Sequence, residues 1–240
     1  MENALYIGMS RHNILQTSMD MVANNLANMN TSGYRAQNPL FEEYLSKPKG
    51  QKDAMSFVLD YGQYDTTKAG PVQVTGGTFD LALNGPGFFG VNTPEGVQYT
   101  RGGNFTINNT GELVTAAGFR VASENGGFIT VPEDAKNVKI HEDGTIVSDG
   151  GILGKIMIHE FANVQTLEPQ GNSLYKSETP GAVATETRAL QGYLEGSNVQ
   201  PVVEMTRMIN ILRDYQSTQN FLKTEHDRQR GAIERLGRTS

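Results

Sequence analysis

The chain has 240 residues, 27 of them glycine, with no cysteine and no tryptophan. The absence of cysteine excludes disulfides, thiolate catalysis and zinc–thiolate sites. A net charge of -6 at pH 7 argues against general nucleic-acid binding.

Residues 1–33 predict a helical arm. Apolar side chains recur about every 3.5 residues between positions 3 and 30, with His12 in one slot of the repeat. Thr31-Ser32-Gly33 suits the end of a helix, and Gly33 suits a left-handed cap. The apolar stripe contains Leu5, Met9, Leu15, Met19, Val22, Leu26 and Met29.

The opening "MENALYIGMSRHNILQ" lacks a basic start followed by an apolar run. It therefore does not read as a cleaved secretory signal. No stretch approaches the roughly 18 apolar residues that a membrane-spanning helix needs. We expect no membrane insertion, and a signal-independent export route stays open.

The middle of the chain changes character twice. Residues 34–70 mix aromatic and charged side chains, and we expect an irregular connector with at most one strand, at "MSFVLDYG". Residues 71–196 alternate short β-prone runs with glycine-rich turns, which predicts an antiparallel sandwich or barrel as a β-rich domain.

Residues 197–240 predict a second helical arm. Pro201 suits the first helical turn, and Ser197 or Asn198 could cap it. A lone amphipathic helix needs a partner, so the two terminal helices are expected to pair as a coiled coil. The fold class is therefore α+β. The apolar stripe of this arm, polar in its later half, contains Val202, Met205, Ile209, Leu212, Gln216 and Gln219.

The segment "ANNLANMNTSGYRA" holds four asparagines within the first helix, although asparagine is a mediocre helix former. Asn24, Asn25 and Asn28 are three and four positions apart, so they line one side beside the apolar stripe. Their amides could fix the register against a neighbouring helix, as could Gln216 and Gln219; alternatively, they belong to a fraying, solvated turn. Together with the two stripes they form the predicted assembly interface.

Motifs that suggest catalysis are weak. "GPGFFG" at 85–90 matches G-x-G-x-x-G, but strand and turn residues follow it where a dinucleotide site needs a helix. His141-Glu142-Asp143 and His159-Glu160 are adjacent residues, which point to opposite faces of a strand and seldom share one ion. We expect no catalytic, cofactor-binding or metal-binding residues, and no cofactor.

Three blocks resemble the flagellar axial family of rod, hook and hook-associated proteins. The first is "MDMVANNLANMNTSGYRA" at 19–36, and the second is the β-rich block at 79–121 that begins "FDLALNGPGFFG". The third is "LEGSNVQPVVEMTRMINILRDYQSTQ" at 194–219. The length, the opening and "FEEY" at 41–44 are most similar to proximal-rod members, with distal-rod members as the alternative.

The resemblance implies terminal helices paired as an inner coiled coil, with a β-rich domain outside. It also implies export without processing by the flagellar type III apparatus and assembly into the rod that crosses the periplasm. The implied partners are proximal and distal rod subunits, copies of the chain itself, the inner-membrane ring and the export apparatus.

Two other classes stay open from the residues alone: a secreted glycan-active β-domain enzyme with helical arms, and a surface adhesin. Hydrolysis of cell-wall glycan by the purified protein would favour the enzyme. If the chain is a rod subunit, Leu26→Asp should stop incorporation and leave the β-rich domain folded.

Overall fold

A computed structural model describes residues 2–46, 55–65 and 68–237. The chain forms two compact units. We call Met1–Ala27, Gln37–Thr66 and Gln200–Ser240 the helical unit, and Asn28–Ala36 with Thr67–Val199 the β unit. Helices and antiparallel sheets are both present, which confirms the mixed α and β class.

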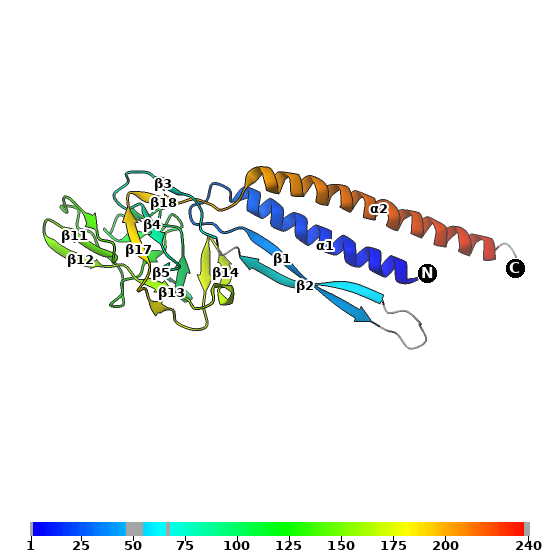
Figure 1. The fold of residues 1–240 in the computed structure, drawn as a ribbon, viewed down its shortest axis with the longest axis horizontal. Helices are drawn as coiled ribbons and strands as arrows, with labels where there is room; N and C mark the ends of the chain where they lie inside the picture. Colours follow the sequence, from blue (N-terminus) through cyan, green and yellow to red (C-terminus); the bar gives the residue numbers. More distant parts are fainter. Residues whose placement is uncertain (1, 47–54, 66–67, 238–240) are drawn as a thin grey trace. The chain divides into compact units, whose positions relative to one another are not determined.

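The helical unit contains helices α1 (Glu2–Ala27) and α2 (Pro201–Gly237), which lie side by side and run antiparallel (Figure 1). The rings of His12 and Tyr215 stack, with centroids 4.4 Å apart. A Cβ built on Gly8 would lie 2.8 Å from Leu222. The contacts advance along α1 as they move back along α2, which fixes the antiparallel direction.

Apart from Asn25, which contacts β1, the least exposed positions of each helix follow a spacing of three and four residues, and we call these positions the seam. This spacing is the one that keeps a single face of a helix turned toward a partner helix. On α1 the seam contains Leu5, Gly8, His12, Leu15, Met19, Val22 and Leu26. On α2 it contains Pro201, Glu204, Met208, Ile211, Tyr215, Thr218, Leu222, Glu225 and Gln229.

The expected stripe of α1 coincides with its seam with two differences: Gly8 occupies the slot assigned to Met9, and Met29 lies beyond the end of the helix. On α2 the expected stripe is displaced from the seam by one residue throughout. Two apolar rows run next to each other on this helix, one through Met208 and Ile211 and the other through Ile209 and Leu212. The periodicity analysis named only the second of these rows, because a spacing of three and four residues fits both and does not show which of them faces α1.

For the described part of 34–70, the predicted strand at "MSFVLDYG" is confirmed, whereas the prediction that the rest is irregular is wrong. Strands β1 (Gln37–Ser46) and β2 (Met55–Asp65) pair antiparallel. Pro39 and the charged residues of β1 lower its β propensity, which hid the strand in the sequence. A two-stranded hairpin leaves one edge of each strand unpaired, so it tolerates a proline.

The first helix ends at Ala27, earlier than the predicted residue 30. Gly33 has the expected left-handed backbone, with φ of 68°. Because it lies well beyond the end of α1, it does not cap the helix. It belongs to the β unit, where its N–H donates to the carbonyl of Glu195 at 2.8 Å.

The β unit is built from short antiparallel strands, as expected. The largest sheet runs β14-β15-β6-β5-β9-β8-β7, with β13 on β5 and β16 on β13; smaller sheets are β10-β11-β12, β17-β4 and β18-β3. A 3₁₀ turn covers Val164–Thr166. The strands are β3 Val72–Val74, β4 Leu81–Asn84, β5 Phe88–Thr93, β6 Gly96–Thr100, β7 Thr106–Ile107, β8 Leu113–Val114, β9 Arg120–Val121, β10 Lys139–Ile140, β11 Thr145–Ser148, β12 Gly151–Lys155, β13 Ile158–Glu160, β14 Glu168–Gly171, β15 Leu174–Lys176, β16 Ala182–Val183, β17 Arg188–Gln191 and β18 Tyr193–Glu195.

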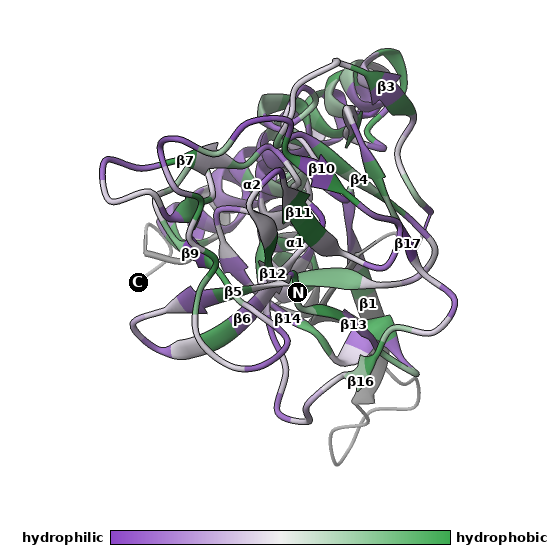
Figure 2. Ribbon diagram, turned by 90° about the vertical axis from the view of Figure 1, so that its left-hand side faces the viewer, coloured by the Kyte–Doolittle hydropathy of each residue, from purple (hydrophilic) through white to green (hydrophobic). Residues whose placement is uncertain are grey.

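Two apolar clusters form the core of the β unit. The larger joins strands of different sheets through side chains such as Leu81, Phe89 and Ile146. The smaller gathers Phe88, Tyr99, Leu167 and Tyr175. Figure 2 shows hydrophobic colour on strands such as β11 and hydrophilic colour on many of the connecting loops. The core therefore forms between short strands that are separated by polar turns.

Candidate assembly interface

The predicted apolar stripe of α2 lies on the surface of the helical unit. Val202 is 77% exposed, Met205 47%, Ile209 52% and Leu212 43%. Single exposed apolar residues are common on proteins, but a contiguous apolar row suggests a surface that binds a partner.

The other predicted interface residues divide by burial. Met9, Asn24, Gln216 and Gln219 are exposed. Leu5, Leu15, Met19 and Leu26 are half-buried, as are Asn28 and Met29 in the β unit. Val22 and Asn25 are buried. The structure thus leaves the α2 stripe, Met9 and the polar residues that continue the stripe available on the surface.

Asn25 acts within its own chain. Its side-chain amide donates to the carbonyl of Gln37 at 2.9 Å and accepts from the Gln37 N–H at 2.9 Å. This pair of hydrogen bonds connects the last turn of α1 to the first residue of β1. Asn28 accepts from the hydroxyl of Thr31 at 3.1 Å, a local turn contact. The partner of the Asn25 amide is therefore a β-strand of the same chain, where a neighbouring helix was expected.

The seam of α2 includes polar side chains that periodicity alone did not flag. Glu204 and Glu225 are buried carboxylates that pair with Arg207 and Arg228 one turn later. The hydroxyl of Thr218, also buried, donates to the carbonyl of Asp214 at 2.8 Å. Buried polar groups reduce the stability that a seam contributes, so this helix pair is weaker than an all-apolar one.

In the β unit, all three resemblance blocks meet at one buried ion pair. Arg101 Nε lies 3.0 Å from Glu195 Oε2, and both side chains are 1% exposed. The second carboxylate oxygen of Glu195 accepts from Gly70 N–H at 3.2 Å. Arg101 also donates to the carbonyls of Gly85, at 2.9 Å, and of Gly87. "GPGFFG" therefore supplies carbonyls to an arginine and continues into a strand.

Chain segments near the unit boundary are joined around this pair. The hydroxyl of Ser32 donates to the Glu195 carbonyl at 3.0 Å. Asn198 accepts from Ala36 N–H at 2.7 Å and donates to the carbonyl of Lys68 at 2.7 Å. Because Asn198 bridges two segments, it does not cap α2, whose Glu204 N–H instead donates to the carbonyl of Gln200 at 3.0 Å.

Burial lowers the pKa of Arg101 to about 10; the charge of Glu195 opposes the decrease and that of Arg35 adds to it. Arg101 therefore stays charged at neutral pH. Both guanidinium groups lie against the ring of Phe88, at 5.4 Å for Arg35 and 5.5 Å for Arg101. Sequence reasoning missed this cluster, although two charged residues inside β-prone runs, in "YTRGG" and "LEGSN", were the available signal.

The histidine motifs stay apart in the β unit. His159 lies on β13 beside Tyr99, with Nδ1 and the phenolic oxygen 3.5 Å apart. His141 follows β10, and its backbone N–H donates to the carbonyl of Thr145 at 2.9 Å. Within residues 2–46, 55–65 and 68–237, no group of three or more metal-ligating side chains is arranged to hold an ion. Neither helix in this part of the chain is long and apolar enough to cross a membrane.

Three family models match the chain: "Flagella basal body rod protein" at residues 5–35, "Flagellar hook protein FlgE/F/G D1 domain" at 82–148 and "Flagellar basal body rod FlgEFG protein C-terminal" at 190–235. The chain is 41% identical to the flagellar basal-body rod protein FlgF of Caulobacter vibrioides, over 99% of both chains. It is 34% identical to FlgG of Bacillus subtilis, covering 95% of this chain and 96% of that one. It is 32% identical to FlgF of Mesorhizobium japonicum over the whole of both. The chain belongs to the family of flagellar basal-body rod proteins.

Proposed function

We propose that this chain is a structural, non-enzymatic subunit of the bacterial flagellar rod, in its proximal segment, and that its terminal helices pack with those of neighbouring subunits. The observation that carries the proposal is the apolar stripe Val202, Met205, Ile209 and Leu212, exposed on a helix that already has an intrachain partner. A contact between two different surfaces of identical subunits does not close on itself, and it therefore builds a helical tube.

Stiffness in such a tube comes from many shared helix contacts, which suits the transmission of torque. The pairing of α1 and α2 as a coiled coil is part of the proposal, supported by the three-and-four spacing of the seam on both helices. The polar residues of the α2 seam fit a helix pair that gains stability from further subunits.

The proximal position is supported by the 41% identity to the FlgF protein of Caulobacter vibrioides, whereas the FlgG protein of Bacillus subtilis, at 34%, and the FlgF protein of Mesorhizobium japonicum, at 32%, are about equally similar to the chain. The distal rod is the second candidate. We place the subunit in the periplasm, after export by the flagellar type III apparatus. Its partners are copies of itself, the other rod subunits and the inner-membrane ring. The glycan-active alternative is not proposed, because the relatives are rod proteins.

The test is Ile209→Asp, with Asn210→Asp as its control. Both positions are exposed on α2, so neither charge is placed in the protein interior, but only Ile209 belongs to the stripe. Each variant is expressed in a strain that lacks the gene, and isolated basal bodies are probed for the subunit. Ile209→Asp should be exported, absent from basal bodies and non-motile, whereas Asn210→Asp should swim. Normal incorporation of Ile209→Asp would refute the proposal.

Leu26→Asp is a less specific test of assembly than Ile209→Asp. Leu26 is half-buried in the seam of α1, so a charge there also disturbs the fold of the single chain.

A further inference from the structure

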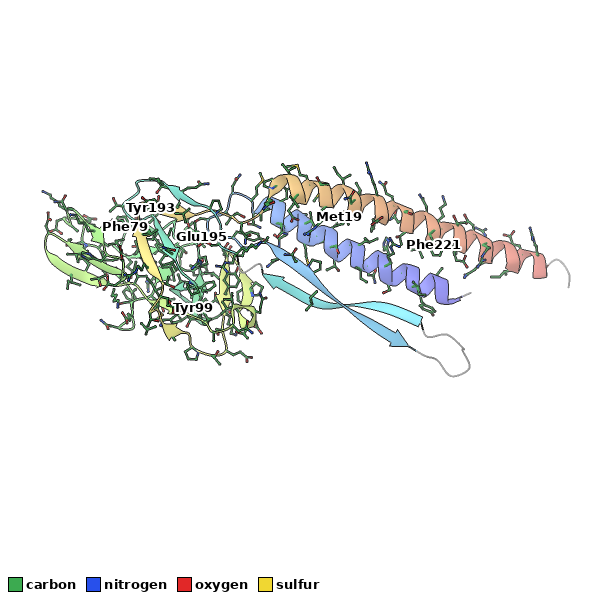
Figure 3. All side chains as sticks on the ribbon, viewed as in Figure 1. Met19, Phe79, Tyr99, Tyr193, Glu195 and Phe221 are labelled. Carbon is green, nitrogen blue, oxygen red and sulfur yellow. The ribbon has the colours of Figure 1, made fainter. Side chains whose placement is uncertain are left out.

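A hollow of about 440 Å³ opens on one side of the helix pair. Its α1 wall is Ile7, Gly8 and Arg11, and its α2 wall is Ser217, Thr218 and Phe221. The absence of a side chain at Gly8 shapes the hollow, since a Cβ there would lie 2.8 Å from Leu222 and 3.3 Å from the ring of Phe221. Phe221, 48% exposed, forms its apolar rim on α2 (Figure 3).

The hollow and the α2 stripe lie on opposite sides of the pair. Stripe residues follow seam residues by one position, as Ile209 follows Met208, whereas Phe221 precedes the seam residue Leu222 by one. One residue turns an α-helix by about 100°, so the two sets leave the seam in opposite directions. In an antiparallel pair the residues that precede each seam face the same side, which explains why Ile7 of α1 borders the hollow together with Phe221.

The size of the stripe restricts what can bind it. Its four exposed side chains offer roughly 400 Å² of apolar surface, the size of the largest patch on many monomers. A stable isolated pair buries about 800 Å² on each partner. One such contact is therefore too small to hold two molecules together on its own. In a helical tube it acts together with the other contacts that each subunit makes.

We infer that the hollow beside Gly8 receives the stripe around Ile209 of a second copy, in a head-to-tail contact. The inference rests on the proposed function and deepens it by naming the two surfaces that meet. Successive copies in such an array point the same way, so their α2 helices run parallel. Ile209 of one copy then lies beside Phe221 of the next, twelve residues along the helix, and successive copies are displaced by about 18 Å along α2.

The chain has no native cysteine, so any disulfide in a cysteine variant must join the introduced residues. The variant Ile209→Cys/Phe221→Cys is produced in cells that lack the wild-type gene, basal bodies are isolated and oxidised, and products are separated without reductant. Within one chain the two positions are about 18 Å apart along the helix, too far for a disulfide, which needs Cα atoms less than about 7 Å apart. We expect a ladder of linked subunits.

The matched control is Asn210→Cys/Phe221→Cys, which moves one cysteine off the stripe and should give no ladder. Ile209→Cys alone should stay monomeric; dimers formed by it would indicate contact between two like surfaces and would overturn the inference. Subunits that enter basal bodies without cross-linking would refute the contact and leave the proposed function standing. If the double-cysteine chain and the unsubstituted chain are both absent from basal bodies, the inference and the proposed function fail together.

Discussion

Arg101 and Glu195 form a fully buried ion pair, although they come from β-prone runs that lie far apart in the sequence. Removal of one partner leaves an uncompensated charge in the protein interior, which typically costs about 3–5 kcal/mol. We therefore expect Glu195→Gln to lower the free energy of unfolding of the β unit by that amount, measured by urea denaturation followed by circular dichroism.

The control for this prediction is Glu142→Gln, which breaks the pair with Arg188 at 3.1 Å, where both side chains are about two-thirds exposed. Exposed pairs contribute about 0–1 kcal/mol, so the control should unfold close to the unsubstituted chain. Equal effects of the two substitutions would show that the burial of Arg101 has no energetic consequence.

Gly33 combines a left-handed backbone with a close approach of a second segment. Its φ is 68°, and an added Cβ would lie 2.3 Å from the carbonyl carbon of Arg101. Gly33→Ala should destabilise the β unit by about 3 kcal/mol or more, because the neighbouring atoms belong to the backbone and must shift. Gly118→Ala is the control, since φ is 84° there but no atom lies within 4 Å; it should cost only about 1 kcal/mol. Similar losses of stability at both positions would show that the left-handed backbone alone accounts for the effect and that the close approach of Arg101 adds nothing.

Asn25 satisfies both backbone groups of Gln37. Asn25→Ala leaves these groups unpaired in a region where the side chain was fully buried, and we expect a loss of about 2–4 kcal/mol in the helical unit. Hydrogen exchange should report faster exchange of the Gln37 amide. Asn13→Ala, an exposed change on the same helix, should leave that amide protected. Unchanged Gln37 protection in Asn25→Ala would contradict the prediction.

A comparison of Ile211 with Ile209 tests which face of α2 packs against α1. Ile211 is half-buried at a seam position, whereas Ile209 is exposed. Ile211→Asp should reduce the helical circular dichroism of the purified chain and its melting temperature, because an aspartate would face α1. Ile209→Asp should change both by little, within about 0.5 kcal/mol of the original stability. A larger loss for Ile209→Asp would place α1 on the stripe face.

His159 should make the β unit sensitive to mild acid. Burial lowers the pKa of its imidazole, and the charge of Glu124 only partly opposes this. In the folded chain the pKa of His159 lies below its unfolded value of about 6.5. The stability that comes from keeping this imidazole neutral is therefore fully present above pH 6.5, and it is lost as the pH falls through the folded pKa. The melting temperature should therefore drop between pH 7 and pH 5. His159→Phe, which keeps a ring beside Tyr99, should reduce this drop, and an unchanged drop would assign it to other groups.

Much of this architecture follows from local sequence patterns. The amphipathic repeats place a helix at each end, because a single apolar face recurs with helical spacing. The spacing of glycine-rich turns predicts short antiparallel strands between residues 71 and 196, because such turns reverse the chain. Strand β1 escaped prediction because Pro39 and its charged neighbours have low β propensity, and only pairing with β2 stabilises it.

The sequence by itself determined that α2 has two adjacent apolar rows, since helical periodicity is a local property. Only the tertiary structure decided which row meets α1, because that choice depends on how both helices pack around Gly8 and Tyr215. The same holds for Arg101, Glu195 and Gly33. Nothing local in their segments indicates that they touch, and they meet because the sheets of the β unit bring distant segments together at a point where a buried charge needs its counter-charge.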